Sequence, residues 1–182
     1  MRLTGLRAAT TYRIRITVDV GAGFQPHTPT VTVRTPAAGR PPVGAWFTLG
    51  NALTGAAELY GSRRADGTPL VLQPPAGNAA QQWRLEAVPG GGYLLRSRVS
   101  GKCVAPLAGV VAPGTPVVQR PCAAADPTQR WAPMPNADGF ALATAAGGLT
   151  LGLGRSRFGE QRLLVLQRPG QARYQNWVAL PA

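Results

Sequence analysis

Three tripeptides decide the fold of this chain: Gln81-Gln82-Trp83, Gln129-Arg130-Trp131 and Gln175-Asn176-Trp177. The gaps between their first glutamines are 48 and 46 residues. A near-constant period of this length is the signature of an internal repeat. One repeat is a supersecondary unit that cannot bury its apolar face alone, so we expect three units to pack around a shared core.

Each tripeptide is preceded by a glycine turn and a short apolar run. The turn glycines Gly67, Gly114 and Gly159 lie 14, 15 and 16 residues before the tripeptide glutamines. The chain is 45% hydrophobic with 23 Gly and 18 Pro. Its apolar runs are short and bounded by turn residues, and no helical periodicity persists beyond about two turns. This pattern predicts an all-β protein.

Residues 44–182 resemble a ricin B-chain-type β-trefoil, the lectin-like fold of three QxW repeats. The match is closest in the second repeat, in the phrase Ser100-Gly101-Lys102-Cys103-Val104 followed by Gly114-Thr115-Pro116-Val117 and Pro121-Cys122. The resemblance implies a β-trefoil with repeats at about 44–95, 96–142 and 143–182.

The tripeptide side chains are expected mainly to hold this fold. We predict that Trp83, Trp131 and Trp177 are core aromatics placed where the three repeats meet. A glutamine amide such as that of Gln129 can hold a tight turn through hydrogen bonds to the backbone.

Both cysteines, Cys103 and Cys122, fall in the second repeat, at positions where the family often pairs cysteines. A bridge would close a loop of about 20 residues and stabilise the fold by roughly 3 kcal/mol on loop-entropy grounds. The alternative is two buried free thiols. Because a bridge needs an oxidising compartment, we expect an extracellular or cell-surface protein.

Sugar-binding members of the family supply four side chains in each active repeat. An Asp accepts hydrogen bonds from two sugar hydroxyls, an aromatic ring stacks on the sugar, and a Gln and an Asn complete the site. The second repeat fills these four positions, in this order, with Ala105, Arg120, Val118 and Thr128. The third repeat fills them with Gly152, Gln167, Val165 and Tyr174.

The first repeat is the only one that keeps a carboxylate. Glu58 stands at the Asp position, with Gln73 at the aromatic position and Asn78 two residues from the Asn position. A second candidate is the third repeat, where a tyrosine and an asparagine flank the tripeptide glutamine. The candidate carbohydrate-binding residues are therefore Glu58, Gln73, Asn78, Gln81, Tyr174, Gln175 and Asn176.

Residues 1–35 have a different pattern. Residues 11–18 alternate β-branched residues with arginine, and residues 30–35 form a second predicted strand. The pair resembles the last strands of a fibronectin type III domain, with Tyr12 at its corner-tyrosine position. Because two strands cannot form a stable sandwich, we expect either that this sequence begins inside a longer protein or that the strands pack against the trefoil. A Pro-rich spacer, residues 36–43, follows.

The net charge of +12 comes from 18 Arg and one Lys set against seven carboxylates. Such a charge attracts anionic partners, among them acidic glycans and anionic cell-wall polymer. The arginines are scattered, with no run of five, so a general composition bias is the competing explanation. No apolar stretch of 18 residues is present, so we expect no membrane span.

The residues needed for catalysis do not form a recognisable set. The single histidine, His27, has no acidic residue near it in sequence except Asp19, which argues against a Ser-His-Asp arrangement. Most of the acids fall in turns, where they are common, and two Cys with one His do not make a zinc site. We predict no enzyme, no cofactor and no metal; any catalytic domain would lie in a missing N-terminal part.

The leading hypothesis is a non-catalytic, monomeric carbohydrate-binding module that targets a larger exported protein to glycans or cell-wall polysaccharide. One alternative is a sugar-inactive trefoil that serves as a protein-interaction or structural domain. A second is charge-driven binding to anionic polymers, without specific recognition of nucleic acid.

Overall fold

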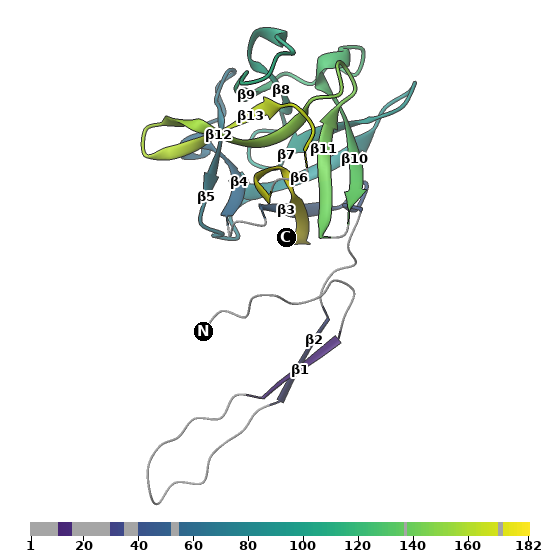
Figure 1. The fold of residues 1–182 in the computed structure, drawn as a ribbon, viewed down its shortest axis with the longest axis vertical. Helices are drawn as coiled ribbons and strands as arrows, with labels where there is room; N and C mark the ends of the chain where they lie inside the picture. Colours follow the sequence, from purple (N-terminus) through teal and green to yellow (C-terminus); the bar gives the residue numbers. More distant parts are fainter. Residues whose placement is uncertain (1–10, 16–29, 35–39, 52–54, 137, 171–172) are drawn as a thin grey trace, which may run out of the picture. The chain divides into compact units, whose positions relative to one another are not determined.

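The computed structural model describes residues 11–15, 30–34, 40–51, 55–136, 138–170 and 173–182 (Figure 1). The chain divides into two compact units, Met1–Ala38 and Gly39–Ala182. His27, Asp19 and residues 36–39 of the Pro-rich spacer lie outside the described residues. Within the second unit Pro41 is buried and Val43 pairs with Leu85, so the end of the spacer packs as part of this unit.

The first unit contains two described strands, β1 (Thr11–Arg15) and β2 (Thr30–Arg34). They pair antiparallel, with Thr11 opposite Arg34 and Arg15 opposite Thr30. Along β1 exposure alternates, because Tyr12 and Ile14 are less exposed than their neighbours. The predicted N-terminal strand pair is therefore present.

Six strands of the second unit form a closed barrel. Each pairs antiparallel with the next, and the last closes on the first. In order around the barrel they are β3 (Trp46–Asn51), β6 (Gln82–Ala87), β7 (Tyr93–Ser97), β10 (Arg130–Asn136), β11 (Gly139–Thr144) and β14 (Trp177–Pro181). Closure of this kind leaves no unpaired edge in the barrel.

The other six strands form three hairpins, one in each repeat. They are β4 (Gly55–Leu59) with β5 (Leu70–Gln73), β8 (Cys103–Pro106) with β9 (Val117–Arg120), and β12 (Thr150–Phe158) with β13 (Gln161–Gln167). The hairpins meet one another in a triangle, through the pairs Pro69 with Val118, Pro116 with Val165, and Leu163 with Val71. The three valines are 47 residues apart, so the contacts repeat with pseudo-threefold symmetry.

Five short 3-10 turns among the described residues connect these strands. Three of them, η2 (Ala79–Gln81), η4 (Pro127–Gln129) and η5 (Arg173–Gln175), end on a tripeptide glutamine. The other two, η1 (Tyr60–Ser62) and η3 (Leu107–Gly109), lie in the loops of the first two hairpins. Each repeat therefore enters its tryptophan-bearing segment through the same tight turn.

The three tripeptide tryptophans lie in one apolar cluster, and each is 0% exposed. Each indole N–H donates to a carbonyl oxygen in the hairpin of its own repeat. The pairs are Trp83 to Ala57 at 3.0 Å, Trp131 to Val104 at 3.0 Å and Trp177 to Leu151 at 2.9 Å. The all-β trefoil that the sequence predicts is confirmed.

Candidate functional site

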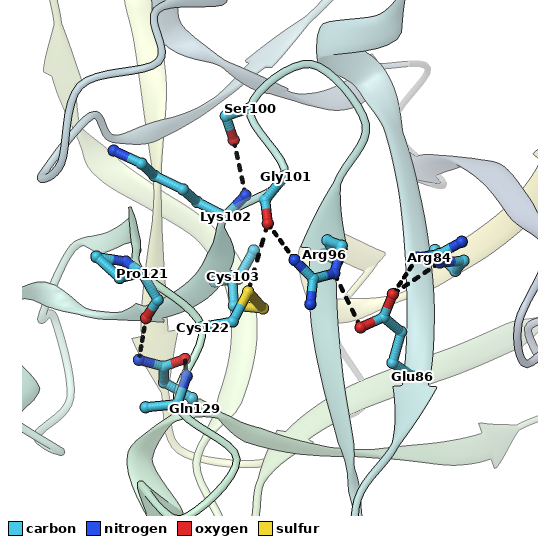
Figure 2. Close-up of a disulfide and its surroundings, with 12 residues drawn as sticks. Arg84, Glu86, Arg96, Ser100, Gly101, Lys102, Cys103, Pro121, Cys122 and Gln129 are labelled. Atoms are coloured by element: carbon cyan, nitrogen blue, oxygen red, sulfur yellow. Dashed lines mark hydrogen bonds and ion pairs between the residues drawn. A yellow bond between two sulfur atoms is a disulfide. The ribbon is translucent and has the colours of Figure 1, made fainter.

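The tripeptide glutamines repeat one hydrogen-bond pattern in all three units. Each side-chain oxygen accepts from a backbone N–H, and each side-chain nitrogen donates to a backbone carbonyl two residues earlier. The N–H groups belong to Ala76, Ala123 and Gly170, at 2.8, 3.0 and 2.8 Å. The carbonyls belong to Pro74, Pro121 and Arg168, at 2.8, 3.0 and 2.9 Å. Gln81, Gln129 and Gln175 are buried, and each fastens the turn before it (Figure 2 shows Gln129).

These contacts fix which residues correspond between repeats. Because Ala57, Val104 and Leu151 all accept from a tripeptide indole, the residues that follow them are equivalent. Those residues are Glu58, Ala105 and Gly152. Each lies opposite an equivalent valine, Val71, Val118 or Val165, across its hairpin.

The first repeat joins its carboxylate to the tripeptide glutamine. Gln81 Nε2 donates to Glu58 Oε2 at 2.7 Å, and Glu58 is 9% exposed. Gln73 is two residues beyond Glu58's cross-strand partner, Val71, so its side chain is on the same face of the hairpin. The structure therefore brings Glu58 and Gln81 into direct contact and places half-buried Gln73 on their face.

Asn78 has a different position and a capping role. Its side-chain oxygen accepts from Ala80 N at 2.9 Å and caps η2. Asp126 does the same for η4 in the second repeat, through Thr128 N at 2.9 Å. Capping by Asn or Asp satisfies an N–H that the turn itself leaves unpaired. The oxygen of Asn78 is thus engaged in the fold, although the side chain is exposed.

In the second repeat the carboxylate position is taken by Ala105, which has no polar group and is fully buried. The aromatic position is taken by Arg120, whose Nη1 lies 3.9 Å from Asp126 Oδ2. A disulfide joins Cys103 to Cys122 beside this hairpin, with a Cα separation of 4.9 Å (Figure 2). The predicted bridge is confirmed, and it ties the start of β8 to the turn held by Gln129.

In the third repeat a neighbouring side chain fills the space at the carboxylate position. A Cβ placed on Gly152 would lie 2.2 Å from Gln167 Oε1. That oxygen accepts from Gln175 Nε2 at 3.0 Å, and Gln167 Nε2 donates to Leu153 O at 3.1 Å. The Gln167 amide therefore occupies the space in which a carboxylate at position 152 would lie, and it accepts the hydrogen bond from Gln175 instead.

In the third repeat Tyr174 lies in η5, and Asn176 directly precedes β14. Tyr174 is 42% exposed. Asn176 is a link between strands, since its side-chain oxygen accepts from Asn136 and its carbonyl accepts from Asn51, both at 3.0 Å. Tyr174 thus offers an exposed ring, while Asn176 ties β14 to β10 and β3.

Glu86 lies between two arginines on the outer face of the barrel (Figure 2). Arg96 Nε donates to Glu86 Oε2 at 2.8 Å, and Arg84 Nε donates to Glu86 Oε1 at 2.8 Å. Burial acts to raise the pKa of Glu86, but the hydrogen bonds and charges of Arg96 and Arg84 outweigh it and hold the pKa below its ordinary value. This ion-pair network links β6 to β7 and is part of the fold.

One aromatic pair was not expected from the sequence. The Tyr60 and Phe158 rings meet edge to face with centroids 4.8 Å apart. The Arg63 guanidinium lies 5.3 Å from the Tyr60 ring centroid. Tyr60 belongs to the first repeat and Phe158 to the third, about 98 residues apart, so no local pattern could have shown that they meet. Tyr60 also packs against the small buried cluster that contains Val71, the residue opposite Glu58.

Comparison with known proteins supports the fold. The family model described as "Ricin-type beta-trefoil lectin domain-like" matches residues 79–165. Over these residues the chain is similar to ricin-type β-trefoil lectin domains. The match lies wholly within the second unit and does not reach residues 1–35, so the fibronectin-like nature of that segment stays a prediction. No curated protein sequence matches the chain significantly.

Three solved trefoil structures show the same architecture at low identity. The designed threefold-symmetric protein ThreeFoil has a TM-score of 0.69 at 21% identity, covering 75% of this chain and 99% of its own. The Rhizoctonia solani agglutinin has a TM-score of 0.68 at 22% identity, covering 79% and 98%. The Macrolepiota procera ricin B-like lectin, solved in complex with lactose, has a TM-score of 0.65 at 19% identity, covering 79% and 99%.

Among the described residues, no three His, Cys, Asp or Glu side chains gather closely enough to hold a metal ion. None of the helical segments that the structure describes has the length and apolar character needed to cross a bilayer.

Proposed function

We propose that residues 40–182 form a non-catalytic carbohydrate-binding module whose working site is in the first repeat. The observation that carries this proposal is the contact between Glu58 and Gln81. A charged group that is 9% exposed is costly unless a structural partner or a ligand compensates it. No ion pair in the described part of the chain involves Glu58, and the group that donates to it, the side chain of Gln81, is a neutral amide.

The chemistry of this site suits a sugar diol. A carboxylate is an acceptor with two oxygens, and Gln81 engages only one of them at 2.7 Å. Gln81 is itself fixed by Ala76 N and Pro74 O, so the carboxylate is held in one orientation. Hydrogen bonds from ligand hydroxyls to an ionised acceptor are stronger than neutral ones. Half-buried Gln73 can add a donor and an acceptor on the same face.

The other two repeats have no carboxylate at the corresponding position, so we expect binding to be weak and confined to the first repeat. Ala105 offers no acceptor, and Gly152 is covered by Gln167. The first repeat also lacks a stacking ring at position 73, where sugar-binding family members place an aromatic. We therefore expect millimolar affinity for a monosaccharide, with useful retention arising when the module is held near a polymer of many sugar units.

The wider setting is part of the proposal. The disulfide favours an oxidising, extracellular setting. The two strands that the structure describes in the first unit would not form a stable domain by themselves, and this supports the proposal that the module works as part of a larger protein. In that protein the trefoil would hold a neighbouring domain close to glycan or cell-wall polysaccharide.

A glycan array followed by calorimetry with the best neutral hit tests the site. Glu58→Gln keeps the shape but removes the charge, and we expect at least a tenfold loss of affinity. Asp138→Asn is the matched control, because Asp138 is an exposed acid outside the first repeat. Equal binding by both variants and the parent would refute the site, and absence of any glycan hit would favour the second candidate below.

The second candidate is a sugar-inactive trefoil that binds a protein or acts as a structural domain. It is favoured by the loss of the carboxylate in two of the three repeats while the buried tryptophans and glutamines are kept. The glycan array and the Glu58→Gln variant distinguish the two candidate functions. The second candidate predicts that no glycan binds and that Glu58→Gln changes only the stability of the protein.

A further inference from the structure

The hairpin of the third repeat is much longer than its two counterparts. β12 has 9 residues and β13 has 7, whereas β4, β5, β8 and β9 have 5, 4, 4 and 4. Figure 1 shows its tip projecting beyond the body of the trefoil. Leu151 and Leu153 are buried in the core, but residues 155–160 are all exposed. The extension, residues 154–162, contributes no side chain to the hydrophobic core, and we name it the ribbon.

The ribbon carries an uncompensated positive charge. Its nine residues include Arg155, Arg157 and Arg162 with a single acid, Glu160. Arg157 and Arg162 are direct cross-strand partners, an arrangement of like charges that destabilises a hairpin. Their guanidinium groups donate to the backbone carbonyls of Glu160 and Gly154, and none of the ion pairs within the described residues involves the ribbon.

An exposed aromatic surface lies at the tip of the ribbon. Phe158 is 42% exposed although it packs edge to face on Tyr60. Arg63, from the first repeat, lies over the Tyr60 ring at 5.3 Å from its centroid and is itself exposed. Tyr60 and Arg63 of the first repeat and Phe158 of the third therefore form one cluster of contacts, and Arg155 and Arg157 lie next to Phe158 in the same exposed segment of β12. We name these five residues the ribbon patch.

We propose that the ribbon patch binds an anionic polysaccharide, one that carries sulfate, phosphate or carboxylate groups along its chain. Planar guanidinium groups match the oxygens of such groups with two parallel hydrogen bonds. The exposed face of Phe158 suits the apolar C–H face of a sugar ring between two charged groups. Anion binding also relieves the repulsion between the facing arginines of the ribbon. The choice of a polysaccharide among polyanions rests on the proposed function.

This site is distinct in chemistry from the carboxylate site of the first repeat. Glu58 is an acceptor for neutral hydroxyl groups and would repel an anion, whereas the ribbon patch supplies donors and positive charge. The two sites therefore respond to different probes. A failure at the ribbon would leave neutral-sugar binding by Glu58 intact, and a failure at Glu58 would leave the ribbon's binding of anions intact.

The experiment measures binding of fluorescein-labelled dextran sulfate to the full chain by anisotropy at several salt concentrations, with unsulfated dextran alongside. Arg155→Gln combined with Arg157→Gln is expected to weaken binding at least tenfold and to make the salt dependence shallower by about 1–2 logarithmic units per decade. Arg40→Gln combined with Arg168→Gln removes the same net charge from exposed positions outside the patch and should change affinity less than threefold.

Two further variants separate a built site from general attraction. Phe158→Ser should weaken binding several-fold without changing the salt dependence, because it removes ring stacking and no charge. Glu160→Gln removes the only acid of the ribbon and should strengthen binding two- to fivefold. The gain from Glu160→Gln cannot be produced by misfolding, so it guards against a trivial explanation of the losses.

Several outcomes would overturn the proposal. One is the absence of dextran sulfate binding by the parent chain at physiological salt. A second is an equal loss in the two double-arginine variants, which would mean attraction by net charge alone. A third is equal affinity for single-stranded DNA of matched charge, with the same response to Phe158→Ser, which would make the patch a general polyanion surface.

Discussion

Replacement of the tripeptide tryptophans by phenylalanine tests the repeat architecture directly. Trp83, Trp131 and Trp177 are each 0% exposed, and each donates a hydrogen bond of 2.9–3.0 Å to a hairpin carbonyl. Phenylalanine keeps an aromatic ring but cannot donate that bond. Because the three environments repeat, we expect W83F, W131F and W177F to have closely similar effects.

The expected loss has two parts. A buried tryptophan covers roughly 150–250 Å², and losing about a third of it costs about 1.5 kcal/mol at about 25 cal/mol per Å². The carbonyl that loses its donor is left unpaired in the core, at a cost of about 1–3 kcal/mol. Each variant should therefore lower the free energy of unfolding by about 3 kcal/mol.

Urea unfolding followed by circular dichroism measures these losses without relying on tryptophan fluorescence. Trp46→Phe is the control, because the Trp46 ring is half-buried and stacks on Arg84 at 4.6 Å outside the core cluster. We expect that control to cost less than about 1 kcal/mol. A loss below 1 kcal/mol in any tripeptide variant, or two separate unfolding transitions within residues 40–182, would refute the shared core.

Two further predictions concern stability. Cys103→Ala combined with Cys122→Ala should lower the free energy of unfolding by about 3 kcal/mol, because the bridge closes a sequence separation of 19 residues; a loss below 1 kcal/mol in urea unfolding would contradict this. Glu86→Gln should destabilise the protein at pH 7, because the pKa of Glu86 is lowered in the folded state. The stabilising contribution of the Glu86 carboxylate is present above its unfolded-state pKa of about 4.3, and it is lost as the pH falls through the folded-state pKa. Parent and variant should therefore converge in stability at acid pH, and a difference that stays constant as the pH falls through the acid range would show that packing, not charge, is responsible.

Much of the fold could be predicted because its sequence signals are local and recur in each of the three repeats. The tripeptides, the turn glycines and the short apolar runs each recur near a fixed period, and a unit that cannot bury its own face must pack on its copies. The same period places Glu58, Ala105 and Gly152 at one position, and the indole hydrogen bonds join the residues just before them.

The parts that sequence reasoning missed depend on contacts between distant residues. Gln167 fills the space beside Gly152 through hydrogen bonds that no pattern encodes. Tyr60 and Phe158 meet only because hairpins of different repeats adjoin. Asn176 was expected as a ligand residue, but it accepts hydrogen bonds from Asn136 and Asn51. These residues are far apart in the sequence and come together only because the barrel closes.

We propose that the trefoil binds neutral carbohydrate through Glu58 in its first repeat alone. A titration of the ¹⁵N-labelled chain with the best neutral glycan, followed by two-dimensional NMR, tests it most directly. The backbone amide of Ala76 should shift on saturation, while its counterparts in the other repeats, Ala123 and Gly170, should not, and Glu58→Gln should abolish the shift. Shifts centred on the second or third repeat, or shifts unchanged in Glu58→Gln, would contradict the claim.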